Sequence, residues 1–287
     1  MTAASGRPLV REFVAPETSR SGLDFPLRRT IRELVRFRDV LYMLVWRDVK
    51  VRYKQSVLGV MWALLMPLII VGAGIAVRFA FTSLSGVPTH ASDVAAVAVK
   101  SAPYGFLVAA LRFGTSSLVS NANLLTKVYV PRLIFPLAAV LSQLFDFFVA
   151  SAVIGIFVLA IGAGVSVQLF WLPLIFLGLL MLVVALSVFL SAASLFFRDV
   201  KYLVEVLLTF LVFFVPVFYD SRMVGKWKPL LMLNPISPIL EAASLTVVDH
   251  VTPDLRWFAY SLISGVVLLW VALAVFRKLE PYFAESV

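Results

Sequence analysis

Long apolar stretches separated by short polar segments dominate the chain, and they predict a series of membrane-spanning helices. Between Leu133 and Phe197 the only charged side chain is that of Asp146. Such a stretch is typical of helices in lipid, because backbone polar groups left unpaired in hydrocarbon are costly. The alternation of apolar and polar residues that marks a membrane β-barrel is not seen. We therefore expect an all-α, polytopic membrane protein.

Six apolar stretches predict six transmembrane helices. They cover about 59–81, 94–119, 133–162, 171–197, 202–219 and 257–276. An ionisable residue inside a membrane helix is a candidate for function. For Asp146 we favour packing or a dimer contact, with a hydroxyl or amide partner, over proton coupling. For Arg112, near the inner end of the second helix, we favour snorkelling to the headgroups, with contact to a pyrophosphate as the alternative.

The N-terminal part is polar and divides into two regions. Residues 1–26 lack the apolar core of a signal peptide and predict a flexible cytosolic tail. From Leu27 to Val45, apolar residues recur at helical spacing with arginines on the opposite face, which predicts an amphipathic helix at the membrane interface, and we assign 27–58 to it. Packing of this helix on another protein domain is the alternative. We expect 59–276 to form the six-helix transmembrane domain and 277–287 a short cytosolic tail.

The segment between the fifth and sixth helices contains too many prolines to cross a membrane as one helix. Pro229, Pro235 and Pro238 divide it into short pieces. Ser237 and Pro238 predict the N-cap and first turn of a helix that ends near Val248. We expect a re-entrant outer segment that moves as a lid.

Charge asymmetry predicts the topology. Most lysines and arginines lie in the N-terminal 58 residues, in 120–132, in 198–201 and at 277–278, which share one side if six helices cross. That side is predicted to be cytosolic, so both termini are inside.

Composition narrows the class of protein. The chain is 61% hydrophobic and 14% charged, with a mean hydropathy of +0.98, a net charge of +9 and no cysteine. Disulfides and thiolate metal sites are therefore excluded. The basic residues collect beside the predicted membrane helices, so we assign them to anionic headgroups rather than to nucleic acid.

No catalytic, metal or phosphate-binding pattern is found in the sequence. The only acidic residue from Gln55 to Phe145 is Asp93, and the two histidines, His90 and His250, are far apart. The pattern G-x-x-x-x-G-K-[ST] is missing. We expect no catalytic residue, no metal and no cofactor bound by this chain. If the protein uses ATP, a separate subunit must hydrolyse it.

The polar region 120–132 predicts a short cytosolic helix from Asn121 to Tyr129. Asn121 is expected to cap it with its side chain, and Pro131 to end it. Leu124, Leu125 and Val128 would then form an apolar patch. Such a patch is typical of a partner site, with packing beneath the protein's own helices as the alternative.

Several motifs resemble those of ABC-type export permeases for polysaccharides and polyol phosphates, the family of O-antigen, capsule and teichoic-acid exporters. The strongest is the order of residue types over about twenty positions in 47–67: Arg47-Asp48, Lys50, Arg52-Tyr53, Ser56, Leu58-Gly59, Trp62 and Pro67. Leu125 to Arg132, Phe197 to Val200 and Leu233 to Pro238 also resemble this family. One departure is Ala110 to Gly114, where the family usually has a Pro-Trp-like kink.

The resemblance implies a homodimer that forms one channel, with two copies of a cytosolic ATPase that bind ATP and Mg²⁺. It implies export of a lipid-linked polysaccharide across the bacterial inner membrane. The residues expected at the substrate access site are Arg47, Lys50, Arg52, Tyr53, Lys54, Trp62 and Arg112. Those expected to couple to the ATPase are Asn121, Leu124, Leu125, Lys127, Val128, Arg132, Arg198 and Asp199. Those expected in an outer gate are Asn234, Pro235, Ser237, Pro238 and Glu241.

Helical spacing adds a prediction about the access site. Arg47, Lys50 and Lys54 fall within about 60° of one another on a helix and form one cationic stripe. A pyrophosphate-linked substrate in the inner leaflet would meet this stripe.

Three alternatives are compared. An ABC permease for a drug or a small lipid is the closest. A polytopic lipid-sugar enzyme would need convergent acids or histidines. A proton-driven carrier would show inverted repeats and several buried ionisable groups.

Overall fold

The computed structural model describes residues 26–54, 61–85, 90–127 and 130–284. In these ranges the chain forms helices and turns without a strand, which confirms the predicted all-α class. The predicted tail at 1–26 lies outside them except for Pro26, as do Ser56, Leu58 and Gly59.

Four helices in the described ranges are long and apolar enough to cross a membrane, which confirms a polytopic membrane protein. They are α4 (Ala91–Ser120), α6 (Ile134–Ala160), η1 with α7 (Val167–Phe196), and α11 with its continuation (Leu255–Phe283). The other two predicted spans are also helical, as α3 (Met61–Ser85) and α8 (Val200–Phe214). With 15 residues, α8 is about 22 Å long, less than the roughly 30 Å of a bilayer core. The count of six stays a prediction.

The region predicted as one amphipathic helix consists of two helices. They are α1 (Pro26–Arg36) and α2 (Arg38–Lys54), which meet at Phe37. Apolar and polar residues segregate strongly on α1 and hardly at all on α2. The amphipathic pattern thus belongs to α1, which contacts α11, whereas α2 packs along α6.

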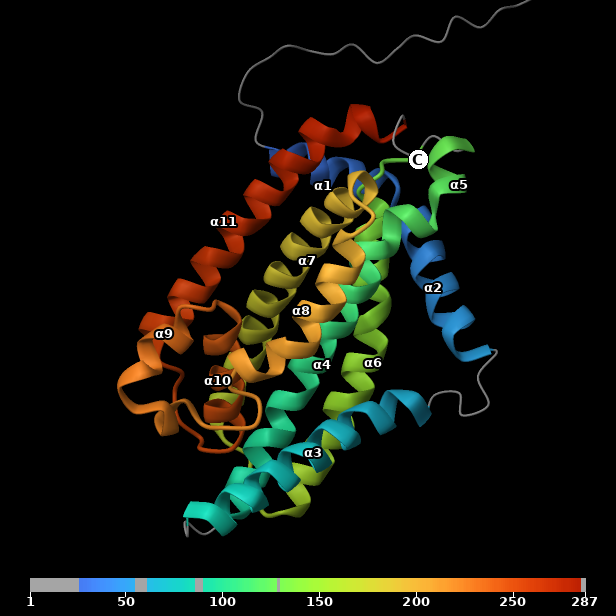
Figure 1. Cartoon of the computed structure of the whole chain (residues 1–287). Coiled ribbons are helices and arrows are strands. Elements are labelled where there is room, and N and C mark those ends of the chain that lie inside the picture. The colour runs from blue at the N-terminus through green and yellow to red at the C-terminus, as the bar shows by residue number, and fades with distance from the viewer. Residues whose placement is uncertain (1–25, 55–60, 86–89, 128–129, 285–287) are drawn as a thin grey trace, which may run out of the picture.

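The centre of the bundle is formed by α4 and α7, with α6 and α11 packed on their outer sides (Figure 1). Small residues allow α4 and α7 to approach closely. A Cβ atom added at Gly114 of α4 would lie 2.6 Å from the hydroxyl oxygen of Ser187 on α7. The Ser187 hydroxyl also donates to the Ala110 carbonyl oxygen at 3.4 Å. Such small-residue contacts are typical of helix packing in membranes.

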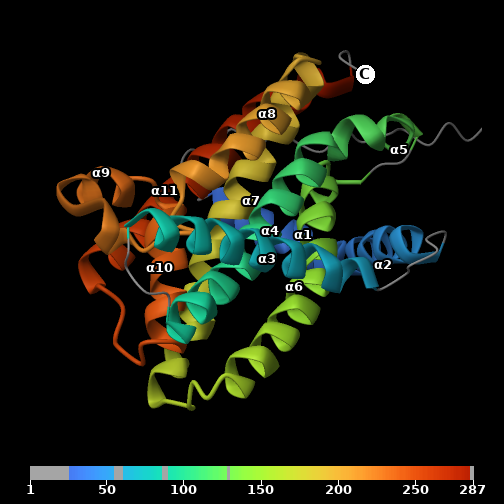
Figure 2. The same ribbon diagram turned by 60° about the horizontal axis from the view of Figure 1, so that its bottom comes forward.

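The remaining elements gather at the two ends of the bundle. The short helix α5 (Ala122–Lys127), the start of α8 and the end of η3 (Glu280–Ala284) lie at one end (Figure 1). Toward the other end lie η2 (Ser221–Trp227), α9 (Lys228–Met232) and α10 (Ile236–Val247). Figure 2 shows α3 lying across α4 and α6, both of which it contacts.

Candidate functional site

A polar cavity of about 550 Å³ lies among α2, α3, α4, α6 and α8. Four of the seven residues predicted for substrate access line it, namely Arg52, Tyr53, Trp62 and Arg112. Further polar groups come from α4, α6 and α8: Ser101, Tyr104, Gln143, Asp146 and Thr209. Aromatic rings complete the wall: Phe106, Phe113 and Phe147. The cavity therefore presents hydrogen-bonding groups and ring faces together.

Asp146 anchors the end of α2 to α6 at this cavity. Its carboxylate accepts hydrogen bonds from the Arg52 guanidinium and from the Tyr53 hydroxyl. The guanidinium also lies 4.9 Å from the centroid of the Phe113 ring. A hydroxyl partner was predicted for Asp146, but the guanidinium was not. The charge of Arg52 is therefore neutralised within the chain.

Arg112, which lines the cavity, pairs with Glu205 of α8. Its Nε atom lies 2.9 Å from Oε1 and 3.0 Å from Oε2 of Glu205. The two side chains are 48% and 40% exposed, so the pair is only partly buried. The favoured prediction, a side chain that snorkels to the headgroups, missed this partner on another helix.

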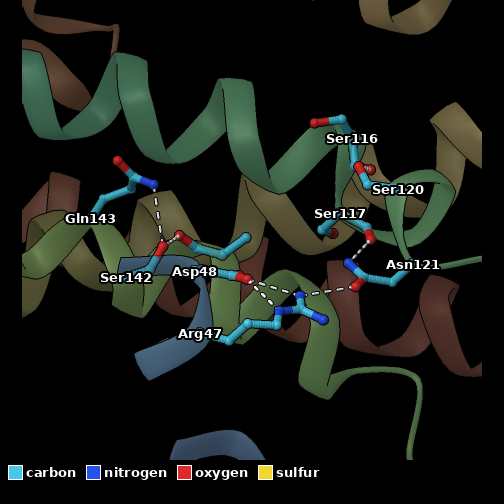
Figure 3. A network of polar contacts seen from close by, with 9 residues as sticks. Arg47, Asp48, Ser116, Ser117, Ser120, Asn121, Ser142 and Gln143 are labelled. Carbon is cyan, nitrogen blue, oxygen red and sulfur yellow. Dashed lines mark hydrogen bonds and ion pairs between the residues drawn. The ribbon is translucent and has the colours of Figure 1, made fainter. Parts of the chain in front are cut away.

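The cationic residues of α2 have two environments. Arg52 lines the polar cavity, whereas Arg47, Lys50 and Lys54 are exposed. Arg47 donates to Asp48 Oδ1 at 2.8 Å and to Asn121 Oδ1 at 3.0 Å (Figure 3). Lys50 has its Nζ atom 5.2 Å from the Trp46 ring centroid. Arg47, Lys50 and Lys54 are all exposed on α2, and their common role as a cationic stripe stays a prediction.

The predicted cap of the connector helix is wrong. The Asn121 side chain points away from α5, because its Nδ2 donates to the Ser117 carbonyl oxygen at 2.8 Å and its Oδ1 accepts from Arg47 (Figure 3). The backbone carbonyl of Asn121 accepts from the N–H groups of Leu124 and Leu125 at 2.9 and 3.1 Å. Asn121 therefore ends α4 and links it to α2.

The apolar patch of α5 is partly covered by the protein itself. Leu124 and Leu125 are half-buried and pack against a core cluster at this end of the bundle. Helix α5 ends at Lys127, and Val128 lies outside the described residues. This favours the alternative of packing beneath the chain's own helices. Exposed at the same end are Arg198 and Asp199, in the turn before α8.

Arg132 ties the connector to the C-terminal segment. Its guanidinium donates to the Glu280 carbonyl oxygen and lies 5.7 Å from the Phe283 ring centroid. Phe283 is buried against Phe196 of α7 and Phe276 of α11. The connector, the end of α7 and the C-terminal segment thus form one packed unit.

The predicted outer gate is packed into the bundle rather than lying loose over it. Asn234 Oδ1 accepts from the N–H of Ile236 at 3.1 Å, and α10 begins at Ile236. The predicted N-cap, Ser237, is therefore wrong: its side chain is buried inside the helix. Pro235 directly precedes α10, and Pro238 is buried in its first turn.

Glu241 holds this outer segment together. Its Oε1 accepts from the Ser221 hydroxyl at 2.6 Å. Nearby, Lys100 of α4 is buried and its Nζ donates to the Tyr219 carbonyl oxygen at 2.9 Å. Burial raises the pKa of Glu241, and the Lys100 charge opposes this rise. The segment 219–241 is thus fixed to α4 by buried polar groups.

The comparison with known families identifies the class of this chain. Residues 39–248 match the family of ABC-2 type transporters. The chain belongs to this family. The matched region of this ABC-2 transporter contains every residue that lines the polar cavity.

Curated relatives of this ABC-2 transporter carry the name O-antigen export system permease protein RfbA. One from Myxococcus xanthus is 28% identical over 262 residues, which cover 90% of this chain and 99% of the relative. Two from Klebsiella pneumoniae are 28% and 26% identical, and the aligned residues cover 86% of this chain and 94% of each relative.

Two site residues of the ABC-2 transporter were missed from sequence. Glu205 lies in a predicted membrane helix, and an acid in such a helix is itself a signal. Lys100 interrupts another apolar stretch and gives the same signal.

In the described ranges no group of three or more histidines or acids is arranged to hold a metal ion.

Proposed function

We propose that this chain is the membrane permease subunit of an ATP-driven exporter that moves a lipid-linked, O-antigen-like polysaccharide across the bacterial inner membrane. The observation that carries the proposal is the similarity to O-antigen export permeases over 86–90% of the chain, within the ABC-2 type family. The relatives' names favour a polysaccharide over a drug or a small lipid.

The polar cavity supports a polar polymer as the cargo. Its tyrosine, serine, threonine and glutamine side chains supply both donors and acceptors. Its ring faces, such as those of Trp62 and Phe113, can stack on the C–H faces of sugars. The residues predicted for substrate access contact the cargo in this cavity. The paired guanidinium groups of Arg52 and Arg112 supply the N–H donors nearest to an anionic linkage.

ATP hydrolysis is assigned to a separate subunit. The sequence has no phosphate-binding loop. The family resemblance implies that ATP and Mg²⁺ bind to a cytosolic partner present in two copies. The elements that face this partner are α5 and the exposed turn at Arg198 and Asp199, which lie at the same end of the bundle. The lysines and arginines at this end support a cytosolic location for it and for both termini.

A homodimer completes the transport path in this proposal. One side of the polar cavity is bounded by α8. Four large apolar residues of α8 repeat at helical spacing and are exposed, namely Leu203, Leu207, Phe210 and Phe214. A second copy packed on this face would enclose a passage between two polar cavities.

The test compares surface glycan in cells that lack the gene and in cells that carry variants. Deletion should remove the glycan from the surface and cause its lipid-linked form to accumulate inside. Gly105 lines the polar cavity, and a Cβ atom there meets only the tip of Ile70 at 3.9 Å. Gly105→Leu should therefore narrow the cavity and lower export at least tenfold.

Gly72→Leu is the matched control. Gly72 is exposed on α3 and is not among the residues that line the cavity, and a Cβ atom there meets nothing within 4 Å. It should export like the wild type at equal protein level. Normal surface glycan in the deletion strain would contradict the proposed function and would favour a drug or a small lipid as the cargo.

A further inference from the structure

A second, apolar cavity of about 610 Å³ lies beside the polar one. It is formed by α4, α6, η1, α7 and α10. Among the described residues that line it, Ser151 has the only polar side chain. Its size is within the range of ligand pockets. Water would find almost no hydrogen-bonding partner inside it.

A group of phenylalanines separates the two cavities. Phe147 lines both of them. Its ring is stacked on that of Phe176 with centroids 5.2 Å apart, and it lies 5.3 Å from the ring of Phe106. Phe176 lines the apolar cavity and Phe106 the polar one. Phe147 is therefore the partition between a polar and an apolar compartment.

The apolar cavity opens at the end of α6. Two of its lining residues, Leu159 and Val165, are 55% and 76% exposed. They belong to the end of α6 and the turn that follows, beside helices long enough to span a membrane. The mouth of the cavity is therefore lined by apolar side chains.

The two compartments together match an amphiphile. The polar cavity contains the guanidinium groups of Arg52 and Arg112, which are paired with Asp146 and Glu205. Each guanidinium has five N–H donors, so donors remain for the oxygens of an anionic head. The apolar cavity suits a long chain, because burial of each CH₂ group contributes about 0.8 kcal/mol. Phe147 and Ala102, which line both cavities, mark the place where head and chain would join.

We propose that the apolar cavity binds the hydrocarbon chain of a membrane amphiphile whose anionic head lies in the polar cavity. The placement of the head rests on the proposed function, whereas the placement of the chain rests on the cavity alone. A lipid carrier and a bilayer phospholipid both have this chemistry.

A glycine in the wall makes the cavity testable. Gly155 of α6 lines it, and a Cβ atom there meets nothing within 4 Å. A leucine at this position therefore fills cavity space without displacing the backbone. Ser151→Phe, one turn earlier on α6, fills the same space from a second position. Gly72→Leu is the control, because it adds the same side chain at an exposed position of α3 that does not line the cavity.

The experiment uses the purified full chain in lipid nanodiscs with two photoactivatable probes. One is phosphatidylglycerol with a diazirine near the end of an acyl chain, and the other is a polyprenyl phosphate with a diazirine near the end of its chain. After illumination, labelled residues are identified by mass spectrometry. We expect label on Val158 or Ile175, which line the cavity and are only 2% and 4% exposed.

Gly155→Leu and Ser151→Phe should each lower this labelling at least fivefold, and Gly72→Leu should leave it unchanged. Thermal unfolding of each variant establishes that it is folded. If the polyprenyl phosphate labels the cavity and excess phospholipid does not reduce this labelling, the occupant is the chain of a lipid carrier. If phosphatidylglycerol labels the cavity and excess polyprenyl phosphate does not reduce this labelling, the occupant is a bilayer lipid. Either result supports the chain site.

Two results would overturn the proposal. One is label confined to Ile156 and Leu177, which are exposed and lie outside the cavity lining. The other is wild-type labelling in a folded Gly155→Leu protein. Because the readout needs neither ATP nor export, its failure is distinguishable from a failure of the proposed function.

Discussion

At the scale of single residues, Asp146 is the contact on which the attachment of α2 depends. It accepts from Arg52 and Tyr53, and the Arg52 and Asp146 side chains are only 23% and 27% exposed. Asp146→Asn would leave the guanidinium largely desolvated without a charged partner, at a cost of about 1–3 kcal/mol. We expect a lower melting temperature in detergent and reduced export.

The control for this substitution is Asp48→Asn. Asp48 pairs with its sequence neighbour Arg47, whose side chain is 41% exposed, so loss of this pair should change the melting temperature little. The exchanged pair Arg52→Asp with Asp146→Arg should recover part of the stability. If the Asp146→Asn protein had the same melting temperature as the wild type, the ion pair would not anchor α2.

At the scale of elements, the segment formed by α9 and α10 tests both topology and packing. The chain has no cysteine, so single cysteines can be introduced without background labelling. Leu233 is 58% exposed, whereas its neighbour Met232 is 1% exposed. Leu233→Cys should react with an impermeant maleimide from outside the cell, and Met232→Cys at least ten times more slowly.

The two possible failures of this labelling have different meanings. Reaction of Leu233→Cys only from the cytosol would reverse the proposed topology. Equal rates at the two positions would show that the segment opens as a lid, which the sequence predicted. The buried side chains of Ser237, Glu241 and Ala243 favour a packed segment instead.

At the scale of the whole molecule, the end that carries α5 is the proposed ATPase surface. Arg198 is exposed there, in the turn before α8, whereas Leu125 is half-buried against the core cluster. Arg198→Glu should weaken co-purification of the ATPase without lowering the melting temperature. Leu125→Asp should lower both, because it places a charge in the chain's own packing.

Lys278→Glu, in the last turn of α11, is the matched charge reversal at this end. It should retain the ATPase if docking is confined to α5 and the turn before α8. Full retention of the ATPase and normal export in Arg198→Glu would remove this turn from the docking surface.

The sequence by itself determined the class of the protein and the approximate positions of its long apolar helices. Lipid excludes unpaired backbone groups, so apolar stretches of this length have to be helical, and α4 at 91–120 lies within three residues of the predicted 94–119. The family resemblance also followed from short motifs of fixed residue order. These features depend on residues close together in the chain, which is why sequence reasoning reached them.

Only the tertiary structure decided which side chains meet. Arg52 and Asp146 are 94 residues apart, and Arg112 and Glu205 are 93 apart. Their pairing depends on how each helix is rotated and where it crosses its neighbour. For the same reason Asn121 turned out to bind Arg47 rather than cap α5, because a donor from α2 competes with the local backbone for its oxygen. Helical periodicity orders residues along one helix, whereas the packing of several helices determines which faces come together.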